Sequence, residues 1–118
     1  MKPVRTILLE QAKEAFAGLN KIVGEQIAKG VQNSDEIQLL NSIKQKIGLI
    51  KQNPFYGDNI KKQLIPKQLD VQNLWRVELS QFWRMLYTIK GDNIEIICFV
   101  LHIISHSTYD KLFGYKKR

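Results

Sequence analysis

The chain contains one cysteine and no apolar run long enough to cross a membrane, and each shortage excludes a class of protein. Cys98 alone rules out an intramolecular disulfide and a cysteine-rich zinc site, and its apolar surroundings indicate a small buried side chain. The longest apolar stretch, residues 94–104, includes Glu95 and His102 and is too short for a transmembrane helix. The residues before Glu10 provide no apolar segment of the length that a signal peptide needs. We therefore expect a soluble, cytoplasmic protein.

Length and composition favour one globular domain over residues 1–118. The 118 residues are 44% hydrophobic and 25% charged, which is ordinary for a folded chain and excludes a disordered tail. Lys and Arg outnumber Asp and Glu by 18 to 11, for a net charge of +7. Residues 51–118 contain 11 of these basic groups and 6 of the acidic ones. An anion-binding surface is therefore expected in the second half of the chain.

The first half of the chain carries the periodicity of two amphipathic helices. Apolar residues recur at steps of three and four over residues 9–27, and Gly30 follows as a helix stop. Capping and acidic residues at 33–36 start a second helix, which the Asn-Pro pair at 53–54 ends. The short linker between the helices predicts an antiparallel helical hairpin. Branched apolar residues at 4–9 predict a short strand before it.

The second half of the chain has the pattern of a sheet. Residues 75–79 and 83–90 alternate between apolar and polar side chains, which is typical of strands with one wet face. A turn at 91–93 leads into residues 94–103, which are nearly all apolar, as expected of a strand covered on both sides. Residues 60–65 could add a short basic strand or an extended loop. The fold class is therefore α+β, with an antiparallel sheet of three to four strands.

Common enzyme signatures are absent from the sequence. The chain has no phosphate-binding glycine loop, no HExxH motif and no G-x-S-x-G motif, and its carboxylates do not form the close pair that a metal-dependent nuclease needs. A nuclease that works without a metal must activate a ribose 2′-hydroxyl, stabilise the charge on the phosphate and protonate the leaving 5′-oxygen. Lys, Arg, His and Tyr can perform these tasks, so no metal and no small-molecule cofactor is expected.

Arg84 is the basic residue whose position most needs an explanation. It lies in the middle of a predicted strand between Trp83 and Met85, where a guanidinium must find a partner. That partner is either Glu78 on the neighbouring strand or an external anion, and both interpretations stay open. The other basic candidates are each, taken alone, solvated surface charges by default: Lys61, Lys62, Lys67 and Arg76.

His106 and Tyr109 follow the last predicted strand, where side chains can reach a groove. The imidazole of His106 could act as a general acid or base near neutral pH, and the alternative is a hydrogen-bonded loop histidine. Tyr87 is predicted to be a core residue with a bonded hydroxyl. Trp75 and Trp83 are predicted to be core residues first, with base stacking as the alternative.

Taken in order, these segments resemble the RelE/ParE superfamily of toxins from toxin–antitoxin systems, over nearly the whole chain. The turn after the hairpin resembles the family's N-P-x-x-G motif, and a basic segment follows it. The two strands resemble the "YRLRxGxYRVLYxI" pair, and the end of the chain resembles the terminal "HRxxxY" box. The matching segments are residues 53–57, 60–64, 74–79, 83–89 and 106–110.

This resemblance implies two N-terminal helices packed on a twisted antiparallel sheet, and one of two activities. RelE-type members cleave mRNA in the ribosomal A site without a metal, whereas ParE-type members inhibit DNA gyrase and cut nothing. Both are neutralised by a co-encoded antitoxin whose wrapping segment is typically acidic, which suits a chain of net charge +7. Carried over by position, the catalytic residues are Arg84, His106 and Tyr109, and the RNA-binding residues are Lys61, Lys62, Lys67 and Arg76.

Two positions depart from the family pattern. Where catalytic members place an arginine at the end of the first strand of the pair, this chain has Glu78, Leu79 or Ser80, and Ser107 replaces the arginine after the histidine. The leading hypothesis is a ribosome-associated mRNA endonuclease toxin. The alternatives are a gyrase-inhibiting toxin that is not an enzyme, and an attenuated toxin-like protein that acts through antitoxin binding and transcriptional autoregulation. The endonuclease hypothesis requires the basic residues, His106 and Tyr109 to share one shallow hollow.

Overall fold

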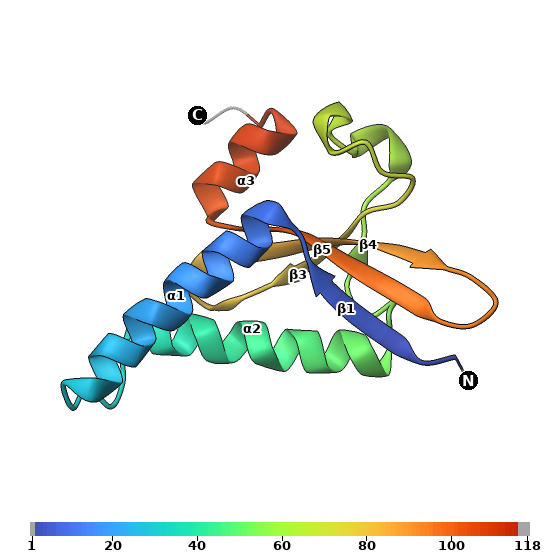
Figure 1. Ribbon diagram of the computed structural model, residues 1–118. Coiled ribbons are helices and arrows are strands. Elements are labelled where there is room, and N and C mark those ends of the chain that lie inside the picture. The colour runs from blue at the N-terminus through green and yellow to red at the C-terminus, as the bar shows by residue number, and fades with distance from the viewer. Residues whose placement is uncertain (1, 116–118) are drawn as a thin grey trace.

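A single sheet separates two long helices on one face from a short helix on the other (Figure 1). The computed structural model describes residues 2–115. Strands are labelled β, α-helices α and single turns of 3-10 helix η. In chain order the elements are β1 (Val4–Leu8), α1 (Glu10–Ala28), α2 (Asp35–Gln52), β2 (Asp58–Asn59), η1 (Lys62–Leu64), η2 (Lys67–Leu69), β3 (Trp75–Glu78), η3 (Ser80–Phe82), β4 (Arg84–Gly91), β5 (Ile96–Ile104) and α3 (His106–Phe113).

The sheet has five strands in the order β1-β5-β4-β3-β2, one more than the three to four predicted. Strands β2 to β5 pair antiparallel, as the meander prediction requires. The N-terminal strand instead pairs parallel to β5, with Val4 opposite Ile96 and Leu8 opposite Val100. Two parallel strands need a long crossover between them, and α1 and α2 supply part of it. The α+β class is confirmed, but the sheet is mixed.

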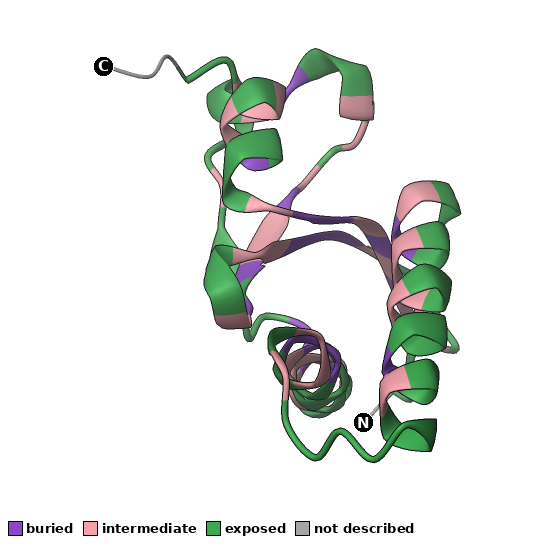
Figure 2. Ribbon diagram, turned by 90° about the vertical axis from the view of Figure 1, so that its left-hand side faces the viewer, coloured by how far each residue is buried: buried purple, intermediate pink, exposed green. Residues whose placement is uncertain are grey.

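The predicted helical hairpin is confirmed with its boundaries close to the expected ones. The Ser34 hydroxyl caps α2 by accepting from the Ile37 N–H at 3.0 Å, and the helix ends at Gln52, with Asn53 as its C-cap just before Pro54. Both helices turn their buried residues toward the sheet (Figure 2). There they cover a core that includes Ala12, Ile43 and Cys98. Cys98 is fully buried, as predicted, and burial raises the pKa of its thiol to about 11.

The other face of the sheet carries a smaller core, and here the structure differs from the sequence-based prediction. Residues 60–65 do not form a strand, because the 3-10 turn η1 occupies Lys62–Leu64. The segment after β5 is not a loop but the helix α3, which the Ser105 hydroxyl caps by accepting from Thr108 N–H and which ends at Gly114 with a φ of 75°. Tyr109 and Leu86 are buried between these segments and the sheet. His106 and Tyr109 therefore occupy a helix face.

Tyr87 ties the turn after α2 to the centre of the sheet. It is fully buried, as predicted, and its hydroxyl donates to the Pro54 carbonyl at 2.7 Å and accepts from the Gly57 N–H at 3.0 Å. A Cβ on Gly57 would lie 2.8 Å from the Arg76 carbonyl oxygen, so only glycine fits this close approach. The same turn leads into β2 and sets Asp58 opposite Arg76 on β3. Trp75 packs partly buried against the same core, as predicted.

Candidate functional site

Two arginines and a glutamate share the sheet face that α3 covers. Glu78 and Arg84 lie directly opposite each other in the β3–β4 register. The Arg84 Nε atom lies 3.3 Å from the Glu78 Oε1 atom, so the carboxylate that the sequence offered as one of two partners for Arg84 is in contact with it. Arg76 lies two residues before Glu78 and therefore on the same face, with 3.9 Å between Arg76 Nε and Glu78 Oε1.

Tyr109 forms the platform on which both arginines rest. The Arg84 guanidinium carbon lies 4.4 Å from the centroid of the Tyr109 ring, and that of Arg76 lies at 5.8 Å. Arg76 Nη1 donates to the Tyr109 hydroxyl at 3.0 Å. The Phe113 ring stacks on the Tyr109 ring, with 4.3 Å between the two centroids. Tyr109 is 2% exposed, so its ring positions the arginines and its hydroxyl is already engaged.

Arg76 is the more firmly held of the two arginines. Its Nη2 atom lies 3.3 Å from the Asp58 carboxylate on β2. Burial lowers the pKa of the Arg76 guanidinium, but the hydrogen bonds to Tyr109 and Asp58 outweigh that effect, and the pKa lies above its ordinary value. Its Nε atom is buried without a hydrogen-bond partner among the described residues. Arg76 therefore orders the site more than it offers donors to a ligand.

The predicted lysines are not equivalent. Lys61 lines a hollow of about 270 Å³ together with Arg76, Tyr109 and the exposed Tyr115. Lys62 and Lys67 are exposed on η1 and η2 and do not line this hollow. Of the three predicted lysines, Lys61 thus lies beside Arg76 and Tyr109, and the other two lie on η1 and η2 outside the hollow. We call Arg76, Glu78, Arg84 and Tyr109 the arginine cluster.

His106 lies at the rim of the cluster. It is the first residue of α3, one helical turn before Tyr109, so the two side chains are neighbours on one helix face. The side chain is 54% exposed, and its Nε2 atom lies 3.3 Å from the Asp110 carboxylate. A half-exposed imidazole beside a carboxylate can exchange protons with water and with a bound ligand. Neither His106 nor Arg84 lines the hollow that contains Lys61, so the structure does not bring all the predicted site residues into one hollow.

Arg76, Arg84 and His106 each have a carboxylate neighbour, which sequence reasoning largely missed. Arg76 pairs with Asp58, Arg84 with Glu78 and His106 with Asp110, each at 3.3 Å. The Glu78–Arg84 pair could be anticipated from adjacent strands. The other two depend on β2 and α3, which the sequence did not reveal. Among residues 2–115, no group of three or more His, Cys, Asp or Glu side chains is placed to hold a metal ion.

Comparisons with known proteins identify the fold. No protein-family model matches the chain, and no curated protein sequence matches it. Its structure is similar to that of the YoeB/ParE toxin from Agrobacterium tumefaciens, with a TM-score of 0.59 and 12% sequence identity over 86% of this chain and 98% of that one. The chain therefore has a toxin fold of the RelE/ParE type, which confirms the structural side of the resemblance. No helix of residues 2–115 combines the length and apolarity that crossing a membrane requires.

Proposed function

We propose that the chain is the toxin of a type II toxin–antitoxin pair and that it cleaves ribosome-bound mRNA without a metal. The fold supports the first part of this proposal. The observation that carries the second is the position of the Arg84 guanidinium, 4.4 Å from the centre of the Tyr109 ring with Glu78 beside it, while His106 lies one helical turn before Tyr109. A carboxylate, a guanidinium and an imidazole on one surface are the groups that ribose-assisted cleavage of a phosphodiester needs.

Each group has a defined task in this reaction. Glu78, as the carboxylate, takes the proton from the ribose 2′-hydroxyl, whose oxygen then attacks the adjacent phosphorus. Arg84 stabilises the additional negative charge. Its Nε atom is paired with Glu78, and its two terminal nitrogens form no hydrogen bond with the described residues, so they can donate to the phosphate. The bond to the 5′-oxygen breaks as protonated His106 donates a proton to it. The products are a 2′,3′-cyclic phosphate and a free 5′-hydroxyl.

The surrounding residues bind the chain of the RNA rather than react with it. Lys61 in the hollow is suited to a phosphate next to the cleaved one, and Lys62 and Lys67 extend the positive surface along η1 and η2. Arg76 and Tyr109 act as positioning residues, since their polar atoms are bonded to each other. An acidic antitoxin segment would neutralise the toxin by covering this surface, and the proposal needs no cofactor.

The test is induced expression followed by mapping of cuts in ribosome-bound mRNA. Arg84→Gln should lower the cleavage rate on the order of a hundredfold or more, because one preorganised charge stabiliser is lost. Arg5→Gln is the matched control, because Arg5 also lies on a strand and pairs with a carboxylate, that of Glu95 at 2.9 Å. Arg5 is on the edge strand β1, whereas Arg84 is on the central strand β4. Equal cleavage by the two variants would overturn the assignment of Arg84.

A non-enzymatic role is the second candidate, and it is favoured by the carboxylates that neighbour Arg76, Arg84 and His106. Asp58, Glu78 and Asp110 compete with an RNA phosphate for the same donors, which weakens phosphate binding. Under this alternative the same fold acts as a binding surface, either as a ParE-type inhibitor of gyrase or as an attenuated protein that binds an antitoxin and regulates its own operon. Intact mRNA with arrested DNA replication would support the former. Harmless expression with tight binding to an acidic partner would support the latter.

A further inference from the structure

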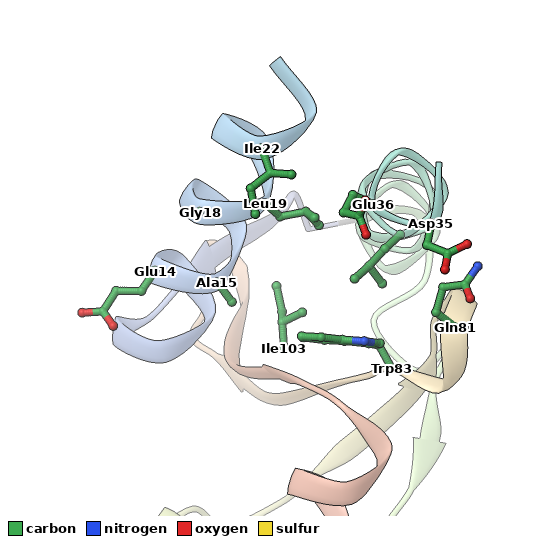
Figure 3. A pocket seen from close by; sticks show the side chains of 11 residues that line it. Glu14, Ala15, Gly18, Leu19, Ile22, Asp35, Glu36, Gln81, Trp83 and Ile103 are labelled. Carbon is green, nitrogen blue, oxygen red and sulfur yellow. The ribbon is translucent and has the colours of Figure 1, made fainter. Parts of the chain in front are cut away.

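A second hollow, of about 480 Å³, lies between α1 and α2, on the face of the sheet opposite the arginine cluster. Its floor is apolar: Trp83 and Ile103 lie between the two helices (Figure 3). Along α1 the lining residues Ala15, Gly18, Leu19 and Ile22 follow the i, i+3, i+4, i+7 spacing of a helix-packing stripe. We call this hollow the hairpin groove.

Apolar side chains that no part of the described chain covers surround the hairpin groove. Ile22 is 46% exposed at one side, and Phe82 is 80% exposed on η3, between Gln81 and Trp83, which both line the groove. Gln81 and Phe82 have φ values of 59° and 61°, in the left-handed region that residues with a Cβ avoid, and Trp83 N–H donates to the Ser80 carbonyl across this turn. Two successive residues in this region form a type I′ turn, which suits the twist of the β3–β4 hairpin, and this turn leaves the Phe82 ring in solvent beside the groove.

Gly18 leaves the groove open on the α1 side. Glycine in the middle of a helix is unfavourable, and an internal packing constraint would normally account for it. A Cβ at Gly18 would meet nothing within 4 Å, so nothing in the described chain requires a glycine there. What the missing side chain does provide is open space along the α1 stripe, which lets another backbone approach closely.

The charges around the hairpin groove define what fits it. The lining residues include Glu14, Asp35 and Glu36 and no basic side chain, in a protein of net charge +7. Glu36 accepts a hydrogen bond from Gln26, and no ion pair engages Glu14 or Asp35 among the described residues. We propose that the groove binds an amphipathic helix of another protein, with apolar side chains on its floor and Lys or Arg side chains along its acidic border. A second copy of this chain fits poorly, because a two-fold contact would bring two acidic borders together.

This site is independent of the proposed RNA cleavage. The two surfaces lie on opposite faces of the sheet, so a helix in the hairpin groove leaves Arg84 and His106 uncovered. The partner also differs in charge from the acidic segment that the family resemblance implies for the basic surface. The groove therefore adds a cationic helical partner to an acidic one.

Two synthetic helical peptides of about 14 residues provide the probe. Both carry Leu at i, i+3, i+4 and i+7, with Lys at the remaining positions of one and Glu at those of the other. Binding is followed by the fluorescence of Trp83, which lines the groove. The Lys peptide should bind, and Gly18→Leu, which fills the groove, should weaken it at least about tenfold. Gly48→Leu is the matched control, because Gly48 is an exposed glycine of α2 with equally free space and does not line the groove.

Charge variants and a test for self-association distinguish a cationic helix from an acidic helix and from a second copy of this chain. Glu14→Gln with Asp35→Asn should weaken the Lys peptide without disturbing the fold, as checked by circular dichroism. Binding of the Glu peptide to this basic protein should be insensitive to Gly18→Leu. The proposal is overturned if Gly18→Leu leaves the affinity for the Lys peptide unchanged, or if it abolishes the affinity for the Glu peptide to the same extent. Concentration-dependent dimers in sedimentation that Gly18→Leu removes would assign the groove to a second copy instead, and would also overturn it.

Discussion

Replacing Tyr87 with phenylalanine tests whether one buried hydroxyl organises the turn that leads to the candidate site. The ring stays in the core, but the Pro54 carbonyl loses its donor at 2.7 Å and the Gly57 N–H loses its acceptor at 3.0 Å. Pro54 is buried and Gly57 is half-buried, so water replaces the hydroxyl poorly. A buried polar group left without a partner costs about 1–3 kcal/mol. Two such groups, one of them partly hydrated, give an expected loss of about 3 kcal/mol in the free energy of unfolding for Tyr87→Phe.

Urea unfolding monitored by fluorescence and circular dichroism measures this loss directly. Tyr56→Phe is the control, since Tyr56 lies in the same turn but is 41% exposed and its hydroxyl has only a 3.4 Å contact with Lys46. We expect Tyr56→Phe to change stability by less than about 0.5 kcal/mol. If the two variants were equally stable, the Tyr87 hydroxyl would not hold the turn, and the placement of Asp58 beside Arg76 would need another cause.

Three further predictions concern stability and reactivity. Gly57→Ala should destabilise the fold by about 2 kcal/mol through its clash with the Arg76 carbonyl, whereas Gly48→Ala should stabilise it by up to about 1 kcal/mol; urea unfolding of both decides, and equal effects would contradict the reasoning. Burial raises the pKa of Tyr87 from 10.0 to about 12, so its contribution is complete below pH 10 and is lost as the pH rises toward 12; the stability gap between wild type and Tyr87→Phe should shrink over that range. The Cys98 thiol, with its pKa raised to about 11 by burial, should react with a disulfide reagent at neutral pH only as fast as the protein unfolds, and rapid labelling would show that it is accessible.

The elements that the sequence predicted well are those whose signals are local. The helical hairpin follows from apolar spacing and from the cap at Ser34, β3 and β4 follow from alternation, and β5 follows from a nearly continuous apolar run after a turn. Strand β1 was predicted as a strand, but its parallel pairing with β5 depends on contacts at the other end of the chain. Helix α3 was missed because it is eight residues long and its first turn contains His106, Ser107 and Thr108, which are weak helix formers, so that packing on the sheet rather than propensity stabilises it.

The candidate site was predictable to the same degree. Arg84 was singled out because a charged side chain in an apolar strand needs a partner, and Glu78 lies opposite it. The burial of Tyr109 depends on α3, and the separation of Lys61 from Lys62 and Lys67 depends on the direction of two 3-10 turns. None of these has a periodic signature, because each results from packing between segments that are distant in sequence.

The pairing of β1 with β5 sets the order in which the chain can fold during synthesis. The partner of Val4 is Ile96, so the first strand leaves the ribosome long before the strand it needs. Helix α1 packs on β5 as well as on α2, so its apolar stripe is only partly covered until that strand emerges. Nucleation has to wait for contacts of high sequence separation, which slows folding. A nascent chain halted before β5 would therefore be incompletely folded and exposed to chaperones and proteases, and neither the arginine cluster nor the hairpin groove would be complete before β5 and α3 have been synthesised.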